Sequence, residues 1–324
     1  MEKIENISLR EKAVSKKPAR IGYYSIKWLV FGVFIIYALS LIIPFLWMLI
    51  NSFKSSQEFG LGNVWGFPEQ FYGLNFIEIL QYEVVTHVGT TNTVLEMFMW
   101  SVLVTVCGTV ISVFLSAVAA YVLSKYKFPG RGLIYGVAIF SMVVPIVGTL
   151  PAQVNMMETL GLDDSFFGVM FLYSGCFGFN FIMLYSAFSS ISWSYAEAAN
   201  MDGAGRFKIF FRVMIPMAKG PIIACCILQA ITLWNDYSTP FLFMPSHYTL
   251  AVGLNQLQTE LSGKGNYPMM FASVIVALIP VLVLYACFQK KIIENTNAGG
   301  LKGWKSIYLY SLWVQQFALE VYLF

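Results

Sequence analysis

Long runs without a charged side chain dominate the pattern of hydrophobic and polar positions in this sequence. Each run is long enough to cross a bilayer as a helix, which takes roughly 20 apolar residues. The runs cover residues 28–53, 97–124, 132–157, 165–196, 220–243 (interrupted by Asp236) and 269–289. The pattern predicts an all-α polytopic membrane protein with six transmembrane helices.

The polar segments between the runs include two long ones on the same side of the predicted bundle, residues 54–95 and 244–268. The first is long enough to contain short helices of its own. Prolines lie in or at the ends of the spans, at Pro44, Pro145, Pro151, Pro240 and Pro280. A broken helix persists in lipid only where protein or a water-filled cavity satisfies the freed backbone. The prolines therefore favour a transport path over a simple anchor.

Composition supports the membrane assignment. Of the 324 residues, 58% are hydrophobic and only 11% are charged, whereas soluble domains carry about a quarter charged residues. A soluble globule of this size is therefore excluded. The five cysteines all lie within apolar runs and form no CxxC pair. They predict small buried hydrophobes and no metal site, because structural zinc needs clustered ligands.

The distribution of Lys and Arg orients the predicted spans, because cytoplasmic loops are enriched in both residues. Among the 20 basic residues, only Lys54 and Lys264 fall on the side opposite to the others. Both termini are therefore expected in the cytoplasm, with residues 1–27 as a cytoplasmic N-terminal segment. The first run is too long for a signal peptide and predicts an uncleaved span.

The basic loop between the fourth and fifth runs has a pattern of its own. Ser194 followed by Glu197 predicts a capping box that begins a helix. Gly203 and Gly205 predict the end of that helix, because glycine adopts the left-handed cap. A basic, aromatic segment follows and ends at Pro216. The loop is expected to form a helix, a turn and a second helix, which either dock a partner or lie along the membrane surface.

This loop resembles the EAA motif of binding-protein-dependent ABC importer permeases, in which EAA, three residues, G and nine further residues precede I-x-L-P. Val213 and Ile215 are conservative departures from the pattern, and the residues around Asp202 resemble the carbohydrate-uptake branch. The resemblance implies a coupling helix that carries ATP-driven closure of an ATPase subunit to the spans. Its expected contact residues are Glu197, Ala198, Ala199, Asp202, Gly203, Gly205 and Pro216.

Two further segments carry the same resemblance. Residues 44–54 are similar to the end of span one in the maltose-type second permease subunit, and residues 295–303 to its terminal tail. The resemblance implies a permease domain at 28–292, with the coupling loop at 193–220, and a cytoplasmic tail at 293–303. The tail residues expected to contact the ATPase are Gly299, Gly300, Lys302 and Gly303. The apolar extension at 304–324 has no counterpart in that resemblance and stays unexplained.

The fifth run contains Trp234, Asn235, Asp236 and Tyr237. A carboxylate within a span is costly and marks a functional site by default, and aromatic faces and amide groups suit sugar rings and hydroxyls. These four residues are candidates for the substrate path. The alternative is a packing or gating role for Asp236. The fourth run adds two weaker candidates, Asn180 and Tyr185.

The sequence contains no GxxxxGK[ST] phosphate loop, so we expect no enzyme activity and no cofactor, with ATP bound by a partner. The resemblance implies a second, non-identical permease, two ABC ATPase subunits and an extracytoplasmic solute-binding protein. The expected cargo is a sugar, the surroundings are membrane lipid, and no nucleic acid is involved. A non-sugar ABC permease and a self-sufficient secondary transporter remain alternatives, the latter usually showing inverted repeats and paired intramembrane ion sites.

Overall fold

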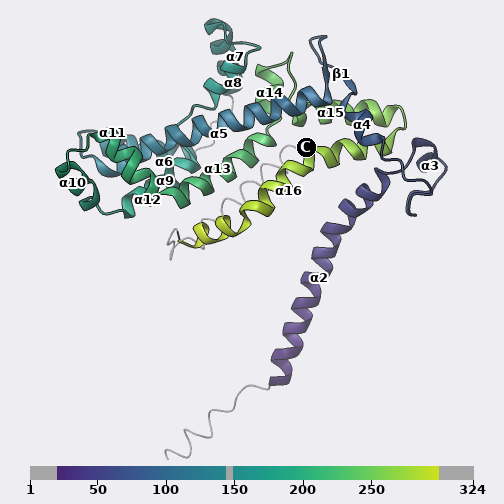
Figure 1. Cartoon of the computed structure of the whole chain (residues 1–324), viewed down its shortest axis with the longest axis horizontal. Coiled ribbons are helices and arrows are strands. Elements are labelled where there is room, and N and C mark those ends of the chain that lie inside the picture. Colours follow the sequence, from purple (N-terminus) through teal and green to yellow (C-terminus); the bar gives the residue numbers. More distant parts are fainter. Residues whose placement is uncertain (1–19, 144–148, 299–324) are drawn as a thin grey trace, which may run out of the picture.

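The computed structural model describes residues 20–143 and 149–298. They form an elongated helical bundle with a long helical arm (Figure 1). One end of the bundle, here called the loop end, carries α10, α11 and α12. The opposite end, here called the hairpin end, carries α3, α4, α15 and a two-stranded hairpin.

A set of packed helices forms the core of the bundle. They are α5 (Val94–Lys125), α9 (Phe179–Ser190), α13 (Lys219–Trp234) and α16 (Tyr267–Ala298). α5 packs against α9 and α13, and α13 packs against α16. Phe181, Leu184 and Phe188 of α9 are fully buried in the largest core cluster. Small polar residues such as Ser101 and Ser112 line the buried face of α5, as is typical where helices approach closely in membranes.

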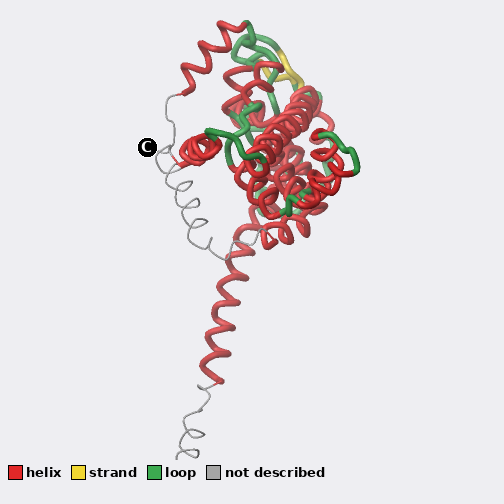
Figure 2. The backbone as a smooth tube through the Cα atoms, turned by 90° about the vertical axis from the view of Figure 1, so that its left-hand side faces the viewer, coloured by secondary structure: helices red, strands yellow, loops and turns green. Residues whose placement is uncertain are grey.

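The first helix, α2 (Arg20–Asn51), leaves the bundle as an arm (Figures 1 and 2). The most apolar 18-residue window of its stretch Lys27–Asn51 contains no residue that is buried within the chain. Near the end of α2 that meets the bundle, the Trp47 ring packs 5.2 Å from the Phe271 ring of α16. A helix that is apolar on every face and lies outside the core is solvated by lipid or by another membrane subunit.

The fold class predicted from the hydrophobic pattern is confirmed, but the runs are not all single helices. In the described residues, α2, α5 and α16 are long and apolar enough to cross a membrane. Residues 206–217 and 219–234 form a fourth span if the bent pair is counted as one. The exact count of six spans stays a prediction.

Two runs that predicted one span each are divided in the structure, and the described parts of a third belong to two helices. In that third run, residues 132–143 lie in α6 (Arg131–Val143) and residues 149–157 lie in α7 (Thr149–Leu160), and residues 144–148 are outside the described ranges. Residues 165–196 contain α8 (Phe166–Leu172), α9 and the start of α10. The fifth run contains α13, which ends at Trp234, and α14 (Ser238–Phe243), so Asp236, the charged residue that interrupts the run, lies in a break between two helices.

The hairpin end contains both long polar segments, as their predicted placement on one side requires. The predicted short helices of the first are α3 (Ser56–Gly60) and α4 (Asn75–Leu80), and the second contains α15 (Leu250–Gly263). An antiparallel hairpin of β1 (Glu83–Val85) and β2 (Thr91–Thr93) is an addition that the all-α prediction missed. Val84, Val85, Thr91 and Thr93 are β-formers, and Gly89 adopts φ +87° in the turn between the strands.

The two basic residues at the hairpin end are held by specific partners. Lys54 is fully buried, and its Nζ donates a hydrogen bond of 2.6 Å to the Asn63 carbonyl oxygen. This burial lowers the pKa of the Lys54 ammonium group. The Nζ of Lys264 donates at 2.7 Å to the Tyr82 hydroxyl, which raises the pKa of Lys264. Both residues therefore have structural partners at this end, which accounts for the two exceptions to the charge pattern.

Candidate functional site

The helix of the EAA-like segment is α10 (Ser194–Met201), at the loop end of the bundle. Its C-terminus is closed by two backbone hydrogen bonds, from Ala204 to the Ala199 carbonyl and from Gly203 to the Asn200 carbonyl, each 3.0 Å long. This pair of bonds is a Schellman motif. Gly203 lies in the left-handed region at φ +79°. The predicted glycine cap is confirmed for Gly203 but is wrong for Gly205, which has φ −67° and extended backbone.

The predicted capping box at Ser194 is wrong. Trp193 has near-helical angles and is the N-cap residue, so Ser194 is the first residue of the helix, and no side chain caps the helix start. The Ser194 hydroxyl instead lies 2.8 Å from the Ser192 hydroxyl. Glu197 does occupy the first turn, where a negative charge suits the helix dipole. A complete capping box in this structure begins α5, between Thr93 and Glu96.

The second half of the loop is α11 (Arg206–Ile209), the π-helical turn η1 (Phe210–Met214) and α12 (Ile215–Met217). Gly205 is the N-cap residue of α11. Pro216 has no N–H to donate to the preceding turn, and the Ile215 amide bonds five residues back, to the Phe210 carbonyl. The helix ends at Met217, one residue beyond the predicted end, and the chain bends by 79° into α13.

One face of this loop is fastened to the bundle and the other is open. Ala196, Ile209, Phe210 and Met214 belong to the core cluster shared with α5 and α9. Lys125, at the end of α5, donates a hydrogen bond to the Ile191 carbonyl just before α10. On the open face of α10, Tyr195, Glu197, Ala198, Asn200 and Met201 are exposed. The loop therefore presents a preformed helix whose far side belongs to the rigid core.

A second candidate site joins the breaks in the fourth and fifth runs. The Asp236 Oδ2 atom accepts a hydrogen bond of 2.8 Å from the hydroxyl of Tyr173, the residue that ends α8. Its Oδ1 atom accepts a bond of 3.2 Å from the Thr239 amide in the first turn of α14. One carboxylate thus caps α14 and ties it to α8. This geometry supports the packing role that the sequence analysis gave as the alternative for Asp236. The direct contact of Asp236 with a solute stays a prediction.

Gly108 of α5 allows these breaks to approach the helix. A Cβ added at Gly108 would lie 2.7 Å from Leu233 Cδ1 and 3.0 Å from Tyr173 Cδ2. Any side chain here would displace residues next to both breaks. Tyr173 and Gly108 were missed in the sequence, where the signal available was Gly175 and Gly178 interrupting the fourth apolar run.

The structure separates the remaining path candidates into different environments. Trp234 is only 8% exposed, and its Nε1 donates at 3.2 Å to the Ala277 carbonyl of α16. Asn180 is buried and donates at 2.8 Å to Gln229 Oε1. Tyr185 lies toward the loop end and accepts a bond of 3.3 Å from Arg131. These three residues do not form one cluster with Asp236.

Asn235 and Tyr237, which flank Asp236, are exposed. The Tyr237 ring stacks on the Phe241 ring of α14 at 5.2 Å. Of the predicted path residues, these two present hydrogen-bonding and aromatic groups on the surface beside the break. The predicted tail contacts, Gly299 to Gly303, lie outside the described residues, and no group of metal-ligating side chains occurs within the described ranges.

The chain is similar to known transport proteins. The family model for the binding-protein-dependent transport system inner membrane component matches residues 77–292. The diacetylchitobiose uptake system permease protein NgcG of Streptomyces coelicolor is 30% identical over 82% of this chain and 85% of its own length. The polygalacturonan/rhamnogalacturonan transport system permease protein YtcP of Bacillus subtilis is 29% identical over 85% of this chain and 97% of its own.

A solved structure shares the fold. A chain from a bacterial ABC transporter involved in the import of the acidic polysaccharide alginate aligns with a TM-score of 0.70 and 26% identity. The alignment covers 85% of this chain and 99% of that one.

Proposed function

This chain belongs to the family of binding-protein-dependent transport system inner membrane components, and from that premise we propose that it moves a sugar or oligosaccharide as a permease subunit of an ATP-binding-cassette importer. It is a membrane transport protein and not an enzyme. In this proposal ATP is bound and hydrolysed by two partner ATPase subunits. A second, similar permease completes the path, and an extracytoplasmic binding protein delivers the solute.

The observation that carries the proposal is the exposed helix α10, closed by its Schellman turn at Gly203 and anchored to α5 and α9. A loop with this construction suits docking better than lying in the membrane surface, because its open face includes Glu197 and Asn200 beside Tyr195 and Met201. The loop end also carries basic residues of the kind enriched on the cytoplasmic side of membrane proteins, which supports the proposal that it faces the compartment where ATP is available.

The sugar assignment rests on two kinds of support. Relatives named for diacetylchitobiose and for polygalacturonan are similar to this chain over most of their lengths. Beside the break, Asn235 and the Tyr237 ring are exposed, and amides and aromatic faces suit hydroxyl-rich rings. A hydrophobic or peptide cargo has no comparable support.

A continuous set of elements connects the docking helix with the break. In this proposal, a displacement of α10 moves α11, η1 and α12, which precede α13 in the chain. α13 in turn ends at Trp234, beside Asp236. Beyond the break, α14 is tied to α8 through the Asp236–Tyr173 bond. We propose that closure of the ATPase dimer displaces α10 and that the spans tilt about the breaks in the fourth and fifth runs. The solute path between the two permease subunits would then open alternately to each side of the membrane.

Two measurements on native membranes test the proposal. A gentle detergent pull-down of the tagged chain should recover a P-loop ATPase and a second multi-span protein. Uptake of labelled oligosaccharides should disappear in Glu197→Lys and Gly203→Asp variants that still insert in the membrane. A chain that purifies alone from actively transporting membranes would favour the alternative of a secondary transporter. Normal uptake by both variants would contradict a coupling role for α10.

A further inference from the structure

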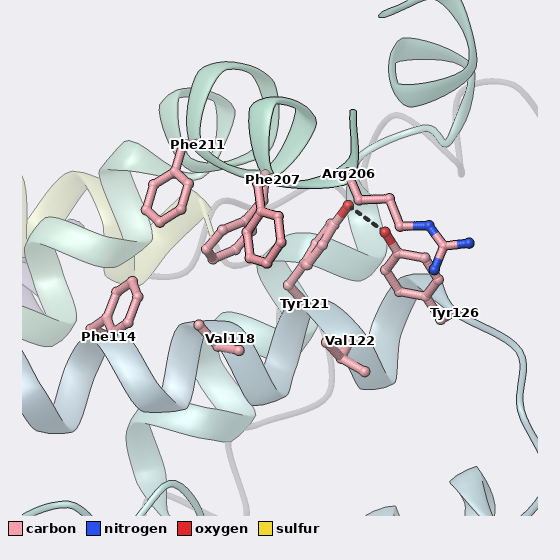
Figure 3. Close-up of a pocket in the computed structure, with 9 residues that line it drawn as sticks. Phe114, Val118, Tyr121, Val122, Tyr126, Arg206, Phe207 and Phe211 are labelled. Carbon is pink, nitrogen blue, oxygen red and sulfur yellow. Dashed lines mark hydrogen bonds between the residues drawn. The ribbon is translucent and has the colours of Figure 1, made fainter. Parts of the chain in front are cut away.

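A groove of about 440 Å³ lies between the last turns of α5 and the α11–η1 segment (Figure 3). Six aromatic side chains, two valines and Arg206 line it. The floor is one face of α5, on which Phe114, Val118 and Val122 recur every four residues. Phe207 and Phe211, also four residues apart, form the opposite wall.

The two ends of the groove differ in chemistry. At one end the Phe114 and Phe211 rings face each other, with centroids 6.2 Å apart and planes 17° apart. At the other end the Arg206 guanidinium lies 5.9 Å from the centre of the Tyr126 ring. Figure 3 shows this arrangement, with the charged group at one mouth and only carbon surface at the far end.

The groove is open and apolar in the isolated chain. Phe207 is 83% exposed, Phe211 50% and Phe114 42%. Contiguous apolar patches of this kind mark interaction or membrane sites. The exposed basic residues Lys208 and Arg212 lie on the same segment as Arg206, so the occupant of the groove must combine an apolar body with a negative group.

The depth of the groove in the membrane also points to one class of ligand. α5 is a long apolar span that ends at Lys125, and Tyr126 and Trp193 pack 5.8 Å apart directly beyond it. Tyr and Trp gather at the level of the lipid headgroups. The charged mouth of the groove is therefore at headgroup depth, and its apolar end extends along α5 toward the hydrocarbon.

We propose that this groove binds an anionic phospholipid of the leaflet facing the loop end. An acyl chain lies between the α5 face and the Phe207 and Phe211 rings, and the lipid phosphate accepts hydrogen bonds from Arg206. Arginine suits this role because its planar guanidinium binds phosphate bidentately. Basic sites between spans on the cytoplasmic side are known to select anionic headgroups. The lipid contacts both α5 and the second half of the coupling loop, and this site is independent of the transported solute.

Photo-crosslinking tests the site in the intact transporter. The tagged chain, with its partner subunits, is reconstituted in phosphatidylcholine vesicles that contain a photoactivatable phosphatidylglycerol or the matching phosphatidylcholine. Labelled peptides are then mapped by mass spectrometry. We expect phosphatidylglycerol to label the peptides around Phe114 and Phe207. Arg206→Gln should reduce this labelling about five-fold, since one basic residue near an anionic surface contributes roughly that factor.

Two further variants separate the lipid from other occupants. Val118→Trp should fill the floor of the groove and abolish labelling, whereas Lys127→Gln, which removes a neighbouring charge that does not line the groove, should leave it unchanged. Equal labelling by the two lipids, or loss in Lys127→Gln to the same extent as in Arg206→Gln, would overturn the proposal. So would labelling that appears only after residues 304–324 are deleted, because that aromatic segment would then be the occupant.

Discussion

The coupling loop and the break at Asp236 are both interruptions of helical structure, but they are stabilised in different ways. The turn at Gly203 is closed by hydrogen bonds between residues no more than five positions apart. The break at Asp236 depends on a side-chain bond to Tyr173, 63 positions away, and on the space left by Gly108 of α5. The first is a local structure with an exposed face, which we propose docks a partner, and the second is a tertiary contact inside the chain.

This difference predicts different responses to mutation. A change in the local turn should affect communication with the ATPase while the bundle stays folded. A change at the tertiary contact should affect both stability and transport, because the same groups hold the half-helices together. The four predictions that follow test this contrast, from the largest expected effect to the smallest.

Among these variants, Gly203→Val should reduce the rate of uptake most. A β-branched residue at φ +79° is strained by roughly 1–2 kcal/mol, yet an added Cβ meets no atom within 4 Å in this chain. The fold is therefore kept while the turn after α10 is altered. Uptake should fall about ten-fold or more, in line with coupling free energies of ~1–3 kcal/mol between sites. Uptake into vesicles at matched protein level is the measurement.

The control is Gly203→Asn, because asparagine tolerates the left-handed conformation and, unlike the aspartate of Gly203→Asp, adds no negative charge beside the exposed face of α10. It should retain most of the uptake. Equal loss in the Asn and Val variants would show that backbone conformation is not what matters at this position.

Asp236→Ala should lower both transport and stability. It removes the acceptor for Tyr173 and the cap on Thr239, and hydrogen bonds within membranes contribute about 0.6 kcal/mol on average and at most ~1.7. Uptake should change several-fold and the Tm of the detergent-solubilised complex should decrease. Tyr173→Phe and the double variant complete a thermodynamic cycle. Strictly additive effects would contradict a direct bond between the two side chains.

Gly108→Ala should destabilise the chain by about 1 kcal/mol, since its Cβ would lie 2.7 Å from Leu233 and overpacking costs roughly that amount. Gly136→Ala in α6 is the matched control. It meets nothing within 4 Å and should be neutral or stabilising by up to ~1 kcal/mol. Thermal unfolding of the two variants gives the comparison. Similar Tm values would mean that the close approach at Gly108 is not required.

Trp234→Phe should have the smallest effect. It removes a hydrogen bond to the Ala277 carbonyl from a side chain that is already buried, so stability should decrease by about 0.5–1 kcal/mol and the KM for uptake should not change. The neighbouring exposed residue gives the contrast, because Asn235→Ala should raise KM. A changed KM in Trp234→Phe would instead indicate that Trp234 contacts the transported solute.

The same contrast explains how much the sequence could predict. Gly203 and Glu197 were placed correctly because a glycine cap and a first-turn acid depend on a few adjacent residues. The start of the helix was placed one residue late, because nothing in the sequence showed that Trp193 would take the N-cap position. The hairpin was missed because three-residue strands within a long polar segment have little periodicity.

The contacts at the break could not be read from the sequence. Asp236 was recognisable as a carboxylate inside an apolar run. Its partner was not, because Tyr173 is one of several aromatic residues in another run, and which of them faces Asp236 depends on the packing of α8 against α14. Trp234 and Asn180 have suitable chemistry for a sugar path but are buried by neighbouring helices, which only the packing reveals.

The most direct test of the account is site-specific photo-crosslinking from α10 in actively transporting membranes. A photoreactive amino acid at the exposed position Ala198 should crosslink to a P-loop ATPase, and the same group at the exposed position Ser262, at the end of α15 on the opposite end of the bundle, should not. This result would establish α10 as the docking helix. Failure of the Ala198 variant to capture an ATPase while transport continues, or capture from both positions, would contradict the account.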